Sequence, residues 1–213
     1  MKRSSTIGII YLIIALVGGF SMGYFPITYI DLNNTEQTFT TLKENLLVFQ
    51  LAIAGDGIVI ILEIFISILL YNFFKNTSIK GSLIALLSRL GMTLIMLLNI
   101  VNYIDPIQSV LHSTEITEAF ILGINTHSQT VFVWEFIFGI HMIALATLIC
   151  KHLNFSKALS FGVLMGGLGY ILDSINHLNR IEHNFLTSTA AILLGVAALS
   201  EITFAILLII KRK

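Results

Sequence analysis

Long apolar stretches alternate with short polar segments along nearly the whole chain. Apolar runs of about twenty residues are typical of helices that cross a lipid bilayer, because about twenty residues of helix span its hydrocarbon core. The pattern predicts six spans, at about residues 7–24, 46–74, 81–104, 129–150, 158–178 and 187–210. We therefore expect an all-α fold, a polytopic bundle of six transmembrane helices that forms a single transmembrane domain over residues 1–213.

The connections between these spans are short, except for residues 105–128 between the third and fourth spans. Within this connection, residues 110–124 have an amphipathic pattern that predicts a short helix lying along the membrane surface. The second span contains Gly55-Asp56-Gly57, a candidate helix break of the kind found in carriers. The second half of the chain has no clear counterpart to this break.

Composition strengthens the membrane assignment, since 56% of the residues are hydrophobic and only 11% are charged. The mean hydropathy is +0.90, whereas soluble domains contain about 25% charged residues. The lipid bilayer is therefore an expected partner. Nucleic acid is not, because the basic residues are few and lie next to the spans. The single cysteine, Cys150, can form no internal disulfide.

Charged residues in the connections are sorted by sign. Six spans place both termini on one side of the membrane, and that side contains only basic residues: Lys2, Arg3, Lys75, Lys80, Lys151, Lys157, Lys211, Arg212 and Lys213. The opposite connections contain seven acids: Asp31, Glu36, Glu44, Asp105, Glu115, Glu118 and Glu182. Because cytoplasmic loops are rich in Lys and Arg, we expect both termini in the cytoplasm. A residue bias toward Ile, Asn and Lys is typical of AT-rich genomes and predicts the plasma membrane of a Gram-positive bacterium.

Ionisable side chains also occur inside the predicted spans. A charge at the centre of a membrane helix costs about 2.5–3.5 kcal/mol, so these groups should face the bundle interior, form pairs or stay protonated. A helix rise of about 1.5 Å per residue separates the polar residues into two layers. The lower layer, roughly 12–17 Å from the cytoplasmic end, contains Glu63, Arg89, His141 and Glu201. The upper layer, roughly 22–32 Å from that end, contains Asp56, Asn99, Asn102, Glu135, Asp173 and His177.

The lower layer predicts a structural ion pair. Arg89 with Glu201 or Glu63 would hold spans two, three and six together, because breaking a buried pair is strongly destabilising. The alternative interpretation is a proton or anion relay through Glu63, Arg89 and His141.

The upper layer predicts a ligand site. Asp56, Glu135 and Asp173 are three carboxylates that cannot all stay ionised in a low-dielectric interior. They require bound protons, a cation or a water-filled pocket. Together with Asn102 and His177 they define a candidate outward-facing pocket for a small polar ligand, an ion or a lipid headgroup.

The fifth span combines close packing with polar chemistry. Its small residues allow a neighbouring backbone to approach: Gly162, Gly166, Gly167 and Gly169. Asp173 and His177 share one helix face, since they are four residues apart, and two metal ligands on a helix have this spacing. Their other interpretation is a hydrogen-bonded structural pair.

Two alternatives to a non-enzymatic binding protein remain open. One is a metal-dependent intramembrane hydrolase, loosely like the ceramidase-type enzymes, in which His141, Asp173 and His177 hold a zinc ion that activates water. The other is a membrane scaffold or immunity-type protein whose polar residues are purely structural. The chain has no phosphate-binding glycine loop, no nucleophile elbow and no His-Glu-x-x-His motif, so no cofactor other than this zinc is indicated.

Several motifs occur in order over almost the full length. They are GDGIVIILEIFISILLY in the second span, SRL at 88–90, FGIH at 138–141, GLGYILD at 167–173, and Glu201 in the last span. In these motifs the chain resembles the bacterial six-span membrane protein family known only as domain of unknown function four-three-eight-six. The resemblance implies that family's fold and, as its characteristic polar positions, Asp56, Arg89, His141, Asp173 and Glu201. The family has no established activity, so the resemblance implies no function.

Overall fold

The computed structural model describes residues 3–181 and 183–210, which form helices without any β-strand. The elements are α1 (Arg3–Gly18), η1 (Gly19–Tyr24), α2 (Phe25–Tyr29), α3 (Thr35–Glu44), α4 (Leu46–Phe74), α5 (Ile79–Asn99), η2 (Ile100–Tyr103), α6 (Ile104–His112), α7 (Glu118–Lys151), α8 (Lys157–Leu178) and α9 (Asn184–Ile210). Five of the charges that predict the topology lie outside the described residues: Lys2, Glu182, Lys211, Arg212 and Lys213.

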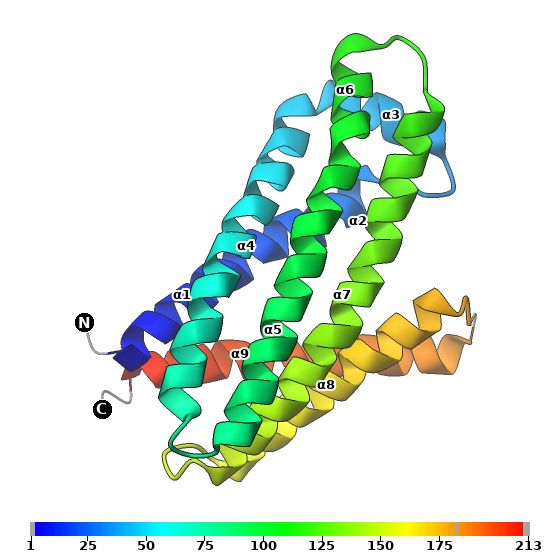
Figure 1. Ribbon diagram of the computed structural model, residues 1–213. Helices are drawn as coiled ribbons and strands as arrows, with labels where there is room; N and C mark the ends of the chain where they lie inside the picture. Colours follow the sequence, from blue (N-terminus) through cyan, green and yellow to red (C-terminus); the bar gives the residue numbers. More distant parts are fainter. Residues whose placement is uncertain (1–2, 182, 211–213) are drawn as a thin grey trace.

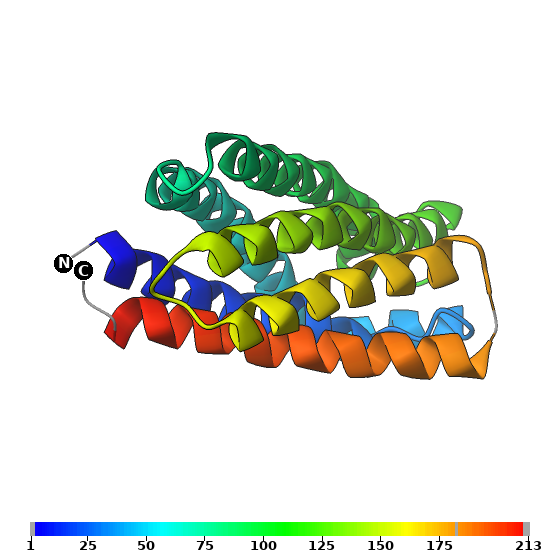
Figure 2. The ribbon, with the colours of Figure 1, turned by 90° about the horizontal axis from the view of Figure 1, so that it is seen from below.

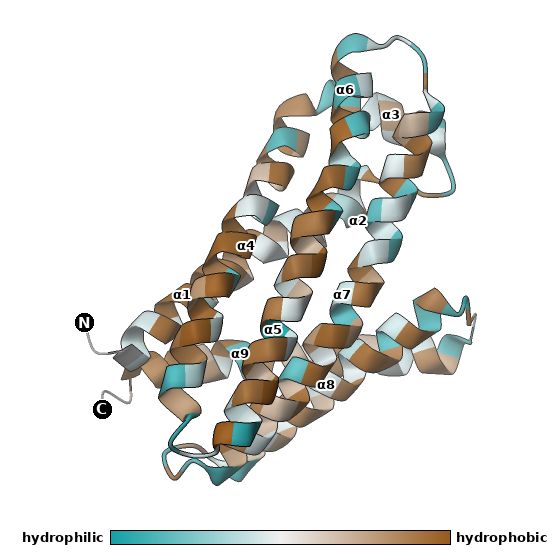
Figure 3. Cartoon of the chain, viewed as in Figure 1, coloured by the Kyte–Doolittle hydropathy of each residue, from teal (hydrophilic) through white to brown (hydrophobic). Residues whose placement is uncertain are grey.

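Six helical segments are long and apolar enough to cross a membrane, as the sequence predicts. They are Ser4–Tyr29, Leu46–Phe74, Ile79–His112, Glu118–Lys151, Lys157–Leu178 and Asn184–Ile210. Hydrophobic residues cover most of their length, and polar residues gather in the turns (Figure 3). The chain is therefore an all-α, multi-pass membrane protein.

The predicted surface helix at residues 110–124 is wrong. The third span continues through η2 and α6 to His112, and α7 begins at Glu118, so only residues 113–117 form the connection. The apolar side of this stretch, which includes Val110 and Phe120, is buried in a second core together with residues of α3 and α4. The amphipathic pattern therefore reflects burial of two helix ends inside the protein. The third and fourth spans each reach 34 residues.

Irregular backbone occurs in the first and third spans. The second span is continuous, because α4 passes through Gly55-Asp56-Gly57 without interruption, so the candidate break is absent there. Instead, η1 is a π-helical turn at the end of α1, and η2 is a 3₁₀ turn between α5 and α6. Such departures from α-helical geometry often mark functional sites or hinges.

The long helices pack in a closed ring. In order, α1 contacts α4, α4 contacts α5, α5 contacts α7, α7 contacts α8, α8 contacts α9, and α9 contacts α1 again. The start of α1 and the end of α9 lie side by side, at the end of the ring that also carries the α4–α5 and α7–α8 turns (Figures 1 and 2). We call this the terminal end. The α6–α7 and α8–α9 turns lie at the opposite end, which we call the far end. There α8 and α9 diverge from α6 and α7 (Figure 1).

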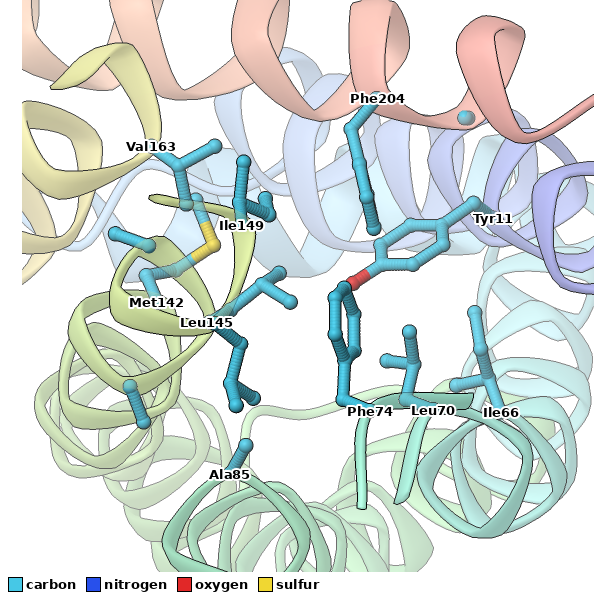
Figure 4. Close-up of a cluster of buried hydrophobic side chains, with 14 of the residues drawn as sticks. Tyr11, Ile66, Leu70, Phe74, Ala85, Met142, Leu145, Ile149, Val163 and Phe204 are labelled. Atoms are coloured by element: carbon cyan, nitrogen blue, oxygen red, sulfur yellow. The ribbon is translucent and has the colours of Figure 1, made fainter. Parts of the chain in front are cut away.

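The main hydrophobic core fills the ring toward the terminal end, where Phe74, Met142 and Phe204 are fully buried (Figure 4). Glycines of the fifth span allow the close packing that the sequence predicts. A Cβ atom at Gly166 would lie 2.6 Å from the Cβ atom of Ala197 in α9. A Cβ atom at Gly167 would lie 2.9 Å from the carbonyl oxygen of Gly139 in α7. Helix α8 thus approaches both neighbours at backbone contact distance.

Candidate functional site

Arg89 lies in the middle of the helix ring and is 1% exposed. Its Nε and Nη2 atoms donate to the two oxygens of Glu63, at 2.5 Å and 3.0 Å. Nη1 donates to the hydroxyl of Tyr11 and to Nε2 of His141, each at 2.8 Å. The guanidinium group is therefore held by a bidentate ion pair and two further hydrogen bonds, the geometry in which arginine binds most strongly.

The hydrogen bonds of His141 identify its tautomer. Nδ1 lies 2.8 Å from the carbonyl oxygen of Ala85, which can only accept, so Nδ1 donates. Nε2 must then be the acceptor for Arg89. A neutral imidazole satisfies both contacts, and both of its nitrogens are occupied by protein groups.

This network, which we call the Arg89 clamp (Tyr11, Glu63, Arg89 and His141), joins four helices of the ring. Glu201 of α9 lies within electrostatic range of Arg89. Of the two predicted partners, Glu63 forms the direct ion pair and Glu201 does not, among the described residues. Tyr11 was not predicted, because a tyrosine in an apolar span looks like any core residue.

The upper layer of polar residues divides into two groups. His127 of α7 lies 4.0 Å from Asp56, and it is eight positions before Glu135, or about 12 Å along the helix. Asp56 and Asn102 therefore belong to one group, and Glu135, Asp173 and His177 belong to the other. The structure does not bring the five predicted pocket residues together into one site.

The first group is centred on four residues that we call the Asp56 cluster (Ser21, Asp56, Tyr103 and His127), with Asn102 beside them. Nε2 of His127 lies 4.0 Å from Oδ2 of Asp56, and the ring of Tyr103 stacks on that of His127 at 3.7 Å. Ser21 is adjacent to Asp56. Oδ1 of Asp56 and the hydroxyls of Ser21 and Tyr103 are buried without hydrogen-bond partners.

Asn99 and Asn102 support this cluster from α5 and η2. Asn99 donates to the carbonyl oxygen of His127 at 3.1 Å, and Asn102 donates to the side chain of Asn99 at 2.9 Å. These bonds tie the irregular turn η2 to α7. Sequence reasoning missed His127 because it assigned residues 105–128 to a connection, whereas α7 already begins at Glu118.

The second group, the α7–α8 carboxyl pair, consists of Glu135 and Asp173, which lie next to each other. Oε2 of Glu135 is buried without a hydrogen-bond partner. Oδ2 of Asp173 lies 3.5 Å from Nδ1 of His177, which also lies 3.0 Å from the backbone carbonyl of Asp173. The ring of His177 stacks on that of Phe132 at 4.0 Å, with the planes only 6° apart.

Comparison with protein families gives a match over nearly the whole chain. The model of the family described as Domain of unknown function (DUF4386) matches residues 6–211. The chain belongs to this family. No curated protein and no solved structure matches it. Membership in DUF4386 agrees with the resemblance that the sequence motifs indicate and supplies no activity.

The zinc site considered for this DUF4386 member is not assembled. His141 binds Arg89 and Ala85 in the Arg89 clamp, whereas Asp173 and His177 contact each other in the other polar group. Within residues 3–181 and 183–210, no three His, Cys, Asp or Glu side chains come close enough together to hold a metal ion. These residues therefore do not fit the hydrolase chemistry.

A small cavity lies beside the Arg89 clamp, between α4, α5 and α7. Its volume of about 10 Å³ is room for a single water molecule. His141 and Ser82 line it, and the hydroxyl of Ser82 is buried without a partner. A water molecule here would satisfy that hydroxyl. A second cavity of about 10 Å³ lies between Asp31 and Asn125, and neither cavity is lined by the predicted pocket residues.

Proposed function

We propose that this protein is a non-enzymatic, multi-pass plasma-membrane protein that binds a primary ammonium group at the α7–α8 carboxyl pair. The ammonium group belongs either to a small free amine or to an amine-bearing lipid headgroup. One observation carries the proposal: two adjacent carboxyl groups, on helices long enough to cross the membrane, form no ion pair with a lysine or an arginine within the described residues, and the only basic group that Asp173 contacts there is the imidazole of His177, at 3.5 Å.

The charge of the pair favours a cationic ligand. Two neighbouring carboxylates repel each other strongly in a low-dielectric interior, and a cation between them removes that repulsion. The buried Oε2 atom of Glu135 makes no hydrogen bond of regular geometry and has the carboxyl group of Asp173 beside it, and an ammonium group offers three donors. The ring of Phe132 beside His177 adds an aromatic face that attracts cations.

Access to the pair supports the same proposal. The side chain of Asp173 is 13% exposed and that of His177 is 45% exposed, so the polar group is open on one side. Both residues lie in the last two turns of α8, which ends at Leu178 near the far end of the ring. A ligand can therefore reach the pair from that end without passing the Arg89 clamp.

Replacing Glu135 with Gln is expected to remove the response to amine-bearing lipid. In nanodiscs of phosphatidylethanolamine the wild-type midpoint of thermal unfolding should lie about 5–10 °C above that in phosphatidylglycerol, as for a ligand present at about one hundred times its dissociation constant. Dissolved ethanolamine added to phosphatidylglycerol nanodiscs distinguishes a free amine from a lipid headgroup as the ligand.

Glu118→Gln is the matched control, because Glu118 is an exposed glutamate at the start of the same helix. It should keep the full lipid response, while Asp173→Asn should lose it as Glu135→Gln does. Equal unfolding midpoints of the wild type in both lipids, with and without ethanolamine, would contradict the proposal.

We also propose that the terminal end faces the cytoplasm and that the carboxyl pair opens to the outside. The distribution of charge supports this orientation, since four basic residues lie in the turns at the terminal end or in the first or last turn of the helices that flank them: Lys75, Lys80, Lys151 and Lys157.

Cysteine labelling tests this orientation in intact cells. In a Cys150→Ser background, Thr114→Cys in the α6–α7 turn should react with a membrane-impermeant maleimide. Leu153→Cys in the α7–α8 turn, where Leu153 is fully exposed, should react only after the cells are lysed. The reverse pattern would place the carboxyl pair on the cytoplasmic side.

A second candidate function is a membrane scaffold. The Arg89 clamp favours it, because all of the guanidinium contacts are internal and join four helices. Under this function, Glu135→Gln and Asp173→Asn would leave unchanged the difference in unfolding midpoint between phosphatidylethanolamine and phosphatidylglycerol nanodiscs. Cells that carry either variant in place of the wild type would grow as the wild type does.

A further inference from the structure

The Asp56 cluster contains more buried oxygen atoms than its own hydrogen bonds satisfy. Asp56, Ser21 and Tyr103 are 2%, 3% and 2% exposed. Oδ1 of Asp56, Oγ of Ser21 and the Tyr103 hydroxyl make no hydrogen bond of regular geometry, although Ser21 lies close enough to Asp56 to interact with its carboxyl group. Leaving several polar groups unpaired in the interior is costly, so three such oxygens within one cluster call for a ligand.

We propose that the Asp56 cluster binds a small monovalent cation such as Na⁺. Its three oxygens come from three different elements, since Ser21 lies in η1, Asp56 in α4 and Tyr103 in η2. A carboxylate and neutral oxygens are the ligand types that hard cations prefer. A cation at this position would bridge three of the helical segments that form the ring.

The charge of the cluster selects a monovalent ion. Asp56 contributes one carboxylate, and within the described residues it forms no ion pair with a lysine or an arginine; the imidazole of His127 lies 4.0 Å from it. One positive charge neutralises one carboxylate, whereas a divalent ion would leave an uncompensated charge in a low-dielectric site. Ca²⁺ in proteins takes about six to eight oxygen ligands, more than the three oxygens of this cluster.

The backbone around the cluster is also unusual for membrane helices. Ser21 lies in the π-helical turn η1, and Tyr103 ends the 3₁₀ turn η2. In membrane transporters, cations are coordinated where helices leave regular geometry, because carbonyl groups there are free to turn toward an ion. The neighbouring helices keep the side chains in place: His127 stacks on Tyr103, and Gly55 of α4 packs against Ser21.

This site is separate from the one in the proposed function. His127 and Glu135 are about 12 Å apart along α7, and the two sites take different ligands. A negative result at the α7–α8 carboxyl pair would therefore not contradict the cation site, and a negative result at the cation site would not contradict the carboxyl pair.

Equilibrium binding of ²²Na⁺ to the purified protein in detergent tests the inference. The wild type should show a single saturable site per chain, and Asp56→Asn should lose it. Sodium chloride, but not choline chloride at the same ionic strength, should raise the unfolding midpoint of the wild type by about 5–10 °C at saturation. Asp105→Asn is the matched control, because Asp105 is an exposed aspartate in α6. It should retain both responses.

Two milder variants keep the test valid if Asp56→Asn fails to fold. Tyr103→Phe removes only the hydroxyl and keeps the ring that stacks on His127, and Ser21→Ala removes only the other hydroxyl. Each should raise the sodium concentration for half-saturation about fivefold to tenfold. No saturable sodium binding to the wild type, or binding that survives Asp56→Asn unchanged, would overturn the inference. The buried oxygens would then be satisfied by water or by a proton on Asp56.

Discussion

Replacing Arg89 with Met is expected to destabilise the protein by about 3–5 kcal/mol, because it leaves the buried carboxylate of Glu63 without its partner. The substitution also removes the donors to Tyr11 and His141. Such a loss is a large part of the stability of a typical domain, so little folded protein should remain. Size-exclusion chromatography of the detergent extract and thermal unfolding would measure this effect.

The double variant Arg89→Met with Glu63→Leu distinguishes an ion pair from a packing role of the arginine. Replacing both charges with apolar side chains removes the uncompensated carboxylate, so the double variant should be more stable than Arg89→Met alone. Lys80→Met is the matched control, since Lys80 is an exposed basic residue on the same helix, and it should have little effect. If the double variant were less stable than Arg89→Met, the ion pair would not be the main contribution of Arg89.

Replacing Gly139 with Leu should separate α7 from α8. Even a Cβ atom at this position would lie 2.7 Å from the carbonyl oxygen of Gly167, an atom of the α8 backbone that cannot rotate away. Overpacking of this kind costs about 3 kcal/mol. The same substitution at Gly195, where a Cβ atom meets nothing within 4 Å, should leave the unfolding midpoint nearly unchanged.

The Gly139 variant also tests the link between packing and the proposed ligand. Glu135 lies one turn before Gly139, and Asp173 lies two turns after Gly167, so the glycine contact sets how the two carboxyl-bearing helices meet. Any folded Gly139→Leu protein should therefore respond less to phosphatidylethanolamine than the wild type. A Gly139→Leu protein with wild-type stability and lipid response would show that α7 and α8 can separate without consequence.

Much of the fold follows from local sequence. Apolar runs of about twenty residues must satisfy their backbone hydrogen bonds internally in lipid, so each becomes a helix. This rule predicts the six spans, and the glycines of the fifth span predict its close packing. The helix ends were less predictable, because residues 105–112 and 118–128 continue helices that bury their apolar side inside the protein, and hydropathy alone does not distinguish such burial from contact with a membrane surface.

The polar contacts were decided by tertiary structure. Helix rise gives the depth of a residue, but it does not give the tilt of a helix or the direction in which a side chain points. Arg89 therefore had two possible partners at similar depth, and only the packing of α4 against α5 selects Glu63. The same limit applies to Asp56 and Glu135, which were assigned to one layer although Asp56 meets α7 at His127, eight residues before Glu135.

The sequence by itself determined that this chain is a six-span, all-helical membrane protein with ionisable groups in its interior, because the cost of polar groups in lipid acts on each segment separately. Only the tertiary structure decided that these groups form the Arg89 clamp, the Asp56 cluster and the α7–α8 carboxyl pair. Those contacts depend on how tilted helices cross, and residues far apart in the chain, such as Ser21, Asp56 and Tyr103, meet only once the ring has closed.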